Sequence, residues 1–237
     1  MFSFTDSRRA VEVAFTDRHG GVSRGTYSSL NLALGGGDDP TAVAENLRRV
    51  GLEFNDGRSL WDMHQVHGDA VAVADPGGDR QTCDGLVTTA PGLALVVRVA
   101  DCVPVLLADP DAGVIGVAHA GRKGLVAGIV PATIEQMRRL GASRIVAWVG
   151  PHICGGCYEV PADLRAEVAA AVPESYAETT WGTPSVDLGA GVGAQLAAAQ
   201  VELVDASSCT RESDDLYSYR RDGDGAGRFA GLIRTAR

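Results

Sequence analysis

Three short segments of this 237-residue sequence carry side chains that could bind a metal ion. His67 is the second histidine of WDMHQVHG, Cys102 lies in ADCVP between two apolar runs, and His119 opens the glycine-rich turn HAGRKG. In α/β proteins, ligands collect where strands end in such turns. A thiolate with two imidazoles suits zinc, and three protein ligands leave a fourth position open, as in catalytic zinc sites.

The spacing of these three residues matches no local metal-binding motif, so other interpretations stay open. Cys102 could be a small buried apolar residue beside two hydrogen-bonded histidines. Cys102 and His119 could instead form the nucleophile and base of a cysteine hydrolase. A copper site is a further alternative, with Met63 as a conceivable axial ligand. A multicopper oxidase also needs a histidine-rich cluster, however, and the chain has only five histidines.

Two further groups of reactive side chains stand out. Arg122 and Lys123 follow His119 in the glycine-rich turn, where an anion could meet both backbone N–H groups and positive charge. Cys154 and Cys157 form a C-x-x-C pair, but there is no second C-x-x-C and no thioredoxin-like context around it. We therefore predict no metal or redox function for this cysteine pair.

Composition narrows the class of protein. Hydrophobic residues make up 45% of the chain and charged residues 22%, which is typical of a globular protein with a sizeable core. The net charge of −9 argues against nucleic-acid and anionic-membrane partners. The N-terminal residues lack the apolar segment of a secretory signal, and no apolar run approaches the roughly 20 residues of a membrane span. We expect a soluble cytoplasmic protein.

Short apolar runs predict a sheet whose strands are partly buried on both faces. The predicted strands cover residues 71–74, 93–99, 103–108, 114–118, 145–149 and 201–204. Helices are predicted between them, the first with Asp39 as N-cap, Pro40 at its first position and Gly51 as its end. The others cover residues 125–140, where Pro131 kinks the helix or marks its start, 161–172 and 187–200.

Eight motifs, in a fixed order, are similar to those of one known family. They are RHGGVS (18–23), SLNL (29–32), QVHG (65–68), DGLVT (84–88), ADCVPVL (100–106), HAGRKG (119–124), CYEV (157–160) and YSYRRD (217–222). With them the chain resembles the YfiH family, also called the laccase-domain, multicopper polyphenol oxidoreductase or peptidoglycan editing factor family. The resemblance implies one α/β (α+β) domain over residues 1–237, a layered α/β/β/α sandwich with mixed sheets and a cysteine-hydrolase-like fold.

The resemblance also implies an activity and a metal site. Zinc would be held by His67, Cys102 and His119, as part of a purine nucleoside phosphorylase with adenosine deaminase activity. Its substrates would be phosphate and adenosine, inosine, guanosine or methylthioadenosine. Zinc lowers the pKa of a bound water to near 7, as deamination requires, whereas phosphorolysis requires cationic groups around phosphate. We assign Arg18, Arg122 and Lys123 to phosphate and Asn31 to the sugar or base.

One departure from the family and two other functions bear on this interpretation. The common family motif HAGWRG reads HAGRKG here, so Lys123 replaces an arginine. Lysine keeps the charge but loses the two-pronged hydrogen-bonding geometry of a guanidinium. The alternative functions are a copper polyphenol oxidase and a thiol hydrolase or peptidoglycan-precursor editing factor that uses Cys102 and His119.

Overall fold

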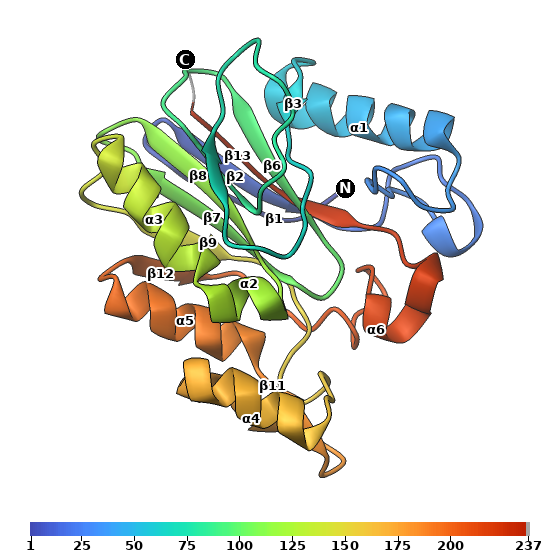
Figure 1. Ribbon diagram of the computed structural model, residues 1–237. Helices are drawn as coiled ribbons and strands as arrows, with labels where there is room; N and C mark the ends of the chain where they lie inside the picture. Colours follow the sequence, from blue (N-terminus) through green and yellow to red (C-terminus); the bar gives the residue numbers. More distant parts are fainter. Residues whose placement is uncertain (236–237) are drawn as a thin grey trace.

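Strands that are apolar on both faces form the centre of the protein. β6 (Ala94–Val99), β7 (Val103–Asp109) and β8 (Val114–Ala120) are buried along their whole length. Because both faces of such strands must be covered, each sheet needs a neighbouring layer on either side. The computed structural model describes residues 1–235 and provides those layers as a helix, two sheets and a set of helices (Figure 1).

The first sheet has five strands in the order β1-β2-β13-β6-β3 and is antiparallel except for the β3–β6 pair. Its other strands are β1 (Phe2–Arg8), β2 (Val11–Thr16), β3 (Leu60–Trp61) and β13 (Phe229–Thr235). The second sheet has six strands in the order β12-β9-β7-β8-β5-β4. Its other strands are β4 (Val71–Val73), β5 (Gly85–Thr88), β9 (Val146–Val149) and β12 (Glu202–Asp205).

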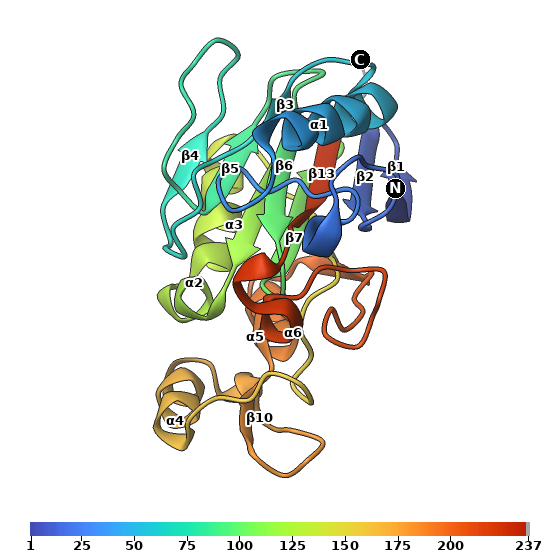
Figure 2. The same ribbon diagram turned by 90° about the vertical axis from the view of Figure 1, so that its right-hand side faces the viewer.

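Helices cover the outer face of each sheet. α1 (Pro40–Asn55) lies on the five-stranded sheet, and Figure 2 shows it on the side opposite α5. The remaining α-helices are α2 (Arg122–Ala127), α3 (Ile129–Arg139), α4 (Ala162–Ala171), α5 (Leu188–Ala198) and α6 (Tyr219–Asp222). Short 3₁₀ helices cover residues 25–27, 173–175 and 223–225, and β10 (Tyr176–Glu178) pairs with β11 (Pro184–Val186). Within residues 1–235, no helix is both long and apolar enough to cross a bilayer.

Three apolar clusters lie between the four layers. Phe15, Trp148 and Phe229 pack between the two sheets. Ile134 of α3 is in the cluster under the six-stranded sheet, and Phe54 of α1 is in the cluster under the five-stranded sheet. The mixed α/β/β/α architecture expected from the sequence is therefore confirmed.

The six predicted strands all form, with ends within two residues of the prediction. The apolar runs did not predict the other seven strands, which are β1, β2, β3, β5, β10, β11 and β13. β1 alternates half-buried and exposed residues, and the apolar run of β13 contains Gly231. The helix predicted over 125–140 is two helices. The break falls at Gly128, where φ is +87°, and Pro131 lies in the first turn of α3. The predicted end of α1 at Gly51 is wrong, because the helix continues to Asn55.

Candidate metal centre and its cavity

The strand order of the six-stranded sheet brings Cys102 and His119 to one edge. β7 and β8 are antiparallel neighbours in which Val103 pairs with Ala120, so the start of β7 lies beside the end of β8. Cys102 immediately precedes β7, and His119 is near the end of β8. The two side chains meet because antiparallel pairing places the start of β7 next to the end of β8.

Asp84 joins this edge from the next strand. β5 is antiparallel to β8, and the His119 N–H donates to the Asp84 carbonyl at 2.8 Å. The Asp84 side chain is fully buried, and its Oδ1 lies 2.7 Å from Nδ1 of His119. This contact fixes the imidazole so that Nε2 is the nitrogen available to a metal ion.

The same carboxylate also holds the loop that carries His67. The backbone N–H groups of Val66, His67 and Gly68 donate to it at 3.1, 2.9 and 2.7 Å. His67 has φ of +62°, a left-handed conformation that is uncommon for residues other than glycine. Three hydrogen bonds to one buried acceptor stabilise that conformation, so Asp84 positions both histidines.

His67, Cys102 and His119 have their ligand atoms within 4.8 Å of one another. The distance from Cys102 Sγ to His67 Nε2 is 3.7 Å, and the two imidazole centroids lie 4.7 Å apart. Sulfur and nitrogen ligands at tetrahedral angles around one zinc ion lie about 3.6 Å apart. The donor set and its spacing therefore fit an ion of this kind.

Electrostatics in the triad favour the metal-binding form of the cysteine. Burial raises the pKa of the Cys102 thiol, but His119 and His67 outweigh this effect and lower the pKa to about 6. Burial lowers the pKa of His119, whereas Cys102 and Asp84 raise it to about 9. Without a metal, the pair is therefore held as thiolate and imidazolium, and a cation would take the place of the proton.

The three side chains line a cavity of about 890 Å³. Arg122, Lys123 and Tyr158 line it beside them, and residues 33–38 with the start of α1 form another part of its wall. Ligand sites in proteins occupy roughly 300–1,000 Å³, so a nucleoside and a phosphate ion fit within this volume.

The four residues assigned to substrate fall into two groups. Arg122 and Lys123 begin α2 at the cavity wall, and within residues 1–235 neither forms a salt bridge with a carboxylate. Arg18 is not among the lining residues, since its guanidinium donates to the Ser28 and Thr26 carbonyls and stacks on the Tyr217 ring.

Asn31 does line the cavity, but its amide is engaged within the protein. Its Nδ2 donates to Asp38, and its Oδ1 accepts from the N–H groups of Ala33 and Arg228. The side chain is fully buried. The Asn31 amide therefore stabilises the cavity wall through hydrogen bonds within the protein.

Asp84, Tyr158 and Arg220 are further residues of this region that were not assigned to the site from the sequence, although Arg220 lies in the basic motif YSYRRD. Asp84 could have been found as a carboxylate that immediately precedes a buried strand. Arg220 lines the cavity, with its guanidinium carbon 4.8 Å from the centre of the Tyr158 ring. Nothing in the local sequence links those two residues, because Tyr158 lies in a loop and Arg220 in the distant helix α6.

Gly121 gives a test of how closely the triad is packed. A Cβ at this position would lie 2.6 Å from His67 Cδ2 and 3.1 Å from Cys102 Sγ. We expect Gly121→Ala to displace the exposed His67 ring and to weaken metal binding by about 10- to 100-fold, the range typical of misplaced ligands. Metal affinity is measured by competition with a chromophoric chelator.

Gly193 of α5 is the matched control. A Cβ there meets no atom within 4 Å, so Gly193→Ala should leave metal affinity unchanged and raise the stability of the helix slightly. Equal metal affinity in the two variants would show that the triad does not bind the ion.

Comparisons with known proteins agree with this fold. A family model described as multi-copper polyphenol oxidoreductase laccase matches residues 12–236. The chain is 53% identical to purine nucleoside phosphorylase SCO2081 of Streptomyces coelicolor, over 98% of this chain and 99% of that protein. It is 55% identical to purine nucleoside phosphorylase ORF3 of Streptomyces griseus, over 94% of each. The crystal structure of protein NMB0706 of Neisseria meningitidis superposes with a TM-score of 0.87 at 32% identity, over 99% of each chain.

Proposed function

Because the chain belongs to the multi-copper polyphenol oxidoreductase laccase family and has close relatives named purine nucleoside phosphorylases, we propose that it cleaves purine nucleosides with phosphate. The substrates are adenosine, inosine, guanosine and methylthioadenosine. The products are the free base and the corresponding sugar 1-phosphate. Zinc at His67, Cys102 and His119 is part of this proposal, as is adenosine deamination in the same cavity.

One observation supports this function above the others. The triad opens into the cavity that Arg122 and Lys123 also line, and neither cation has a salt-bridge partner within residues 1–235. A cation without a carboxylate partner beside a ligand cavity is suited to bind an anion, and phosphate is the anionic substrate here.

A phosphate oxygen forms a bond to C1′ of the ribose, and the bond from C1′ to N9 breaks with its electron pair on the purine. The purine then takes a proton. Arg122 and Lys123 hold the phosphate in an orientation for attack on C1′. Orientation lowers the entropic part of the barrier relative to attack by a freely diffusing ion.

The metal centre supports the second reaction. Zinc, when bound, supplies a Lewis acid that lowers the pKa of water toward 7, which is the chemistry required for attack on C6 of adenosine. In the chain itself, Asp84 holds the His119 tautomer and the His67 loop for that ion. Tyr158 stays a neutral phenol on the cavity wall, since burial and the nearby Cys102 raise its pKa.

The two alternative functions, a thiol hydrolase and a copper polyphenol oxidase, would each need a different arrangement of side chains. A thiol hydrolase needs one imidazole at Cys102, and here two imidazoles flank it. A copper polyphenol oxidase needs a further histidine cluster, and the other candidate ligand group within residues 1–235 consists of cysteines and a glutamate. Both observations favour the phosphorylase proposal with zinc.

A product assay tests the proposal directly. With adenosine and phosphate, we expect adenine and ribose 1-phosphate in equal amounts, separated by chromatography. Without phosphate, adenine release should stop while inosine formation continues, because only phosphorolysis consumes phosphate. Undiminished adenine release in phosphate-free buffer would instead identify the enzyme as a hydrolase.

A further inference from the structure

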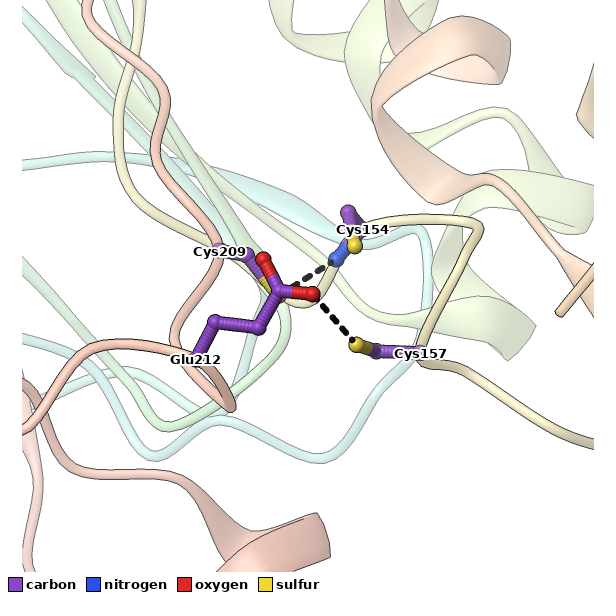
Figure 3. Close-up of side chains that lie close together, drawn as sticks. All are labelled: Cys154, Cys157, Cys209 and Glu212. Carbon is purple, nitrogen blue, oxygen red and sulfur yellow. Dashed lines mark hydrogen bonds between the residues drawn. The ribbon is translucent and has the colours of Figure 1, made fainter. Parts of the chain in front are cut away.

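A second group of metal-binding side chains lies apart from the triad. Cys154, Cys157, Cys209 and Glu212 have their ligand atoms within 4.8 Å of one another (Figure 3). Within residues 1–235, it is the only such group besides the triad. The sequence predicts no metal function for the C-x-x-C pair, but the fold places two further candidate ligands beside it.

Sheet topology explains how the partners meet. β9 and β12 are parallel neighbours, so the loops that follow them leave the sheet at the same edge. His152 and Cys209 continue the ladder as a bridge, with the His152 N–H donating to the Ser208 carbonyl at 3.0 Å. The Thr210 N–H donates to the His152 carbonyl at 3.0 Å. These bonds hold the two loops side by side.

Each loop contributes two donors three residues apart. The first reads Cys154-Gly-Gly-Cys157 and the second Cys209-Thr-Arg-Glu212. The N–H of Cys157 donates to the Cys154 carbonyl at 3.0 Å, which closes a tight turn. Two residues between cysteines is the usual spacing in structural zinc sites, where one turn supplies two of the four ligands.

Two hydrogen bonds within the group join the two loops. The Cys154 N–H donates to Cys209 Sγ at 3.5 Å, and Cys157 Sγ donates to Glu212 Oε1 at 3.3 Å (Figure 3). Three thiolates and a carboxylate this close would repel one another, and a divalent cation at their centre removes that repulsion.

We propose that Cys154, Cys157, Cys209 and Glu212 form a second zinc site, with four protein ligands and a structural role. Thiolates of one tetrahedral zinc lie about 3.8 Å apart, so the side chains need to close by at most roughly 1 Å. Four protein ligands leave no open position for substrate, and this distinguishes the site from the triad.

The site would also fix the loop that presents Cys102. The Ile153 N–H donates to the Asp101 carbonyl at 3.0 Å, and Thr210 Oγ1 donates to Asp101 Oδ1 at 2.6 Å. Asp101 directly precedes Cys102 and has φ of +86°, a strained backbone conformation. Each contact comes from a residue next to a proposed ligand, so zinc here would hold Asp101 from both sides.

Metal analysis of the full chain, expressed with zinc and purified anaerobically with reductant, tests this proposal. We expect about two zinc ions per chain in the parent and about one in the Cys154→Ser/Cys157→Ser variant. The Cys102→Ser variant should also keep about one, at the second site. The melting temperature of the Cys154→Ser/Cys157→Ser variant should fall by about 5 °C or more, because structural zinc contributes to folding stability.

Cobalt provides a readout that does not depend on the stability of that variant. In a Cys102→Ser background, cobalt should still give intense thiolate-to-metal absorption, since three thiolates remain at the second site. The milder change Cys209→Ser should reduce that absorption by about one third, and Glu212→Gln should weaken affinity while the thiolate bands remain. The buried Cys83 is the control, and Cys83→Ala should change neither metal content nor spectrum.

Two results would overturn the proposal. The first is equal zinc content in the parent and the Cys154→Ser/Cys157→Ser variant. The second is a parent that lacks the second zinc and carries a disulfide among these cysteines, seen as a mass two units lower than that of the reduced chain. Neither result bears on the triad or on phosphorolysis, because the assays read metal content and not turnover.

Discussion

His119→Ala is expected to remove one zinc ion per chain and to lower kcat/KM for adenosine deamination by at least about a thousandfold, or about 4 kcal/mol. The triad has only three protein ligands, so two cannot hold the ion at a useful affinity. The substitution also leaves the buried Asp84 carboxylate without its imidazole partner. Cys102→Ser and His67→Ala should give the same loss. Zinc content by elemental analysis and inosine formation are measured on the same samples.

His19 provides the control for this prediction. It is an exposed histidine that pairs with Asp215 and does not line the cavity. His19→Ala should keep the zinc content and the activity of the parent. If Cys102→Ser retained all the zinc of the parent, the assignment of the ligands would be wrong, whatever its activity.

Arg122→Ala combined with Lys123→Ala is expected to lower kcat/KM for phosphate by about a thousandfold, while adenosine deamination stays within a few-fold of the parent. Each cation that contacts phosphate contributes about 2 kcal/mol, since charge-assisted hydrogen bonds are among the strongest in proteins. Deamination uses no phosphate and therefore does not need these charges. Both reactions are followed in one assay by separating adenine from inosine.

Two controls make this result specific. Lys123→Arg should retain phosphorolysis, because the positive charge is conserved. Arg139, which pairs with Glu135 on the surface of α3, should tolerate alanine without effect on either reaction. An equal loss of both reactions in the double variant would remove Arg122 and Lys123 from the phosphate site while leaving the proposed enzyme class in place.

The local sequence was sufficient for the central strands, and it singled out His67, Cys102 and His119 as candidate ligands without showing that they share a site. A strand such as β7, with seven consecutive buried residues, needs a layer on each face wherever it lies, so its apolar run predicts it directly. The terminal strand β1 could not be predicted from an apolar run, because its residues alternate in exposure and its burial depends on pairing with β2. Helix ends were predicted less well, since Gly51 lies within α1 and not at its end.

The sequence by itself determined which side chains could bind a metal ion. It also showed that these side chains lie next to apolar strands. Only the tertiary structure decided which residues share a site, because that depends on the order and direction of neighbouring strands. Antiparallel pairing of β5 and β8 placed Asp84 behind His119, and parallel pairing of β9 and β12 joined Cys209 to Cys154. Arg18 does not line the cavity, because the Thr26 and Ser28 carbonyls of the loop after β2 hold its guanidinium elsewhere.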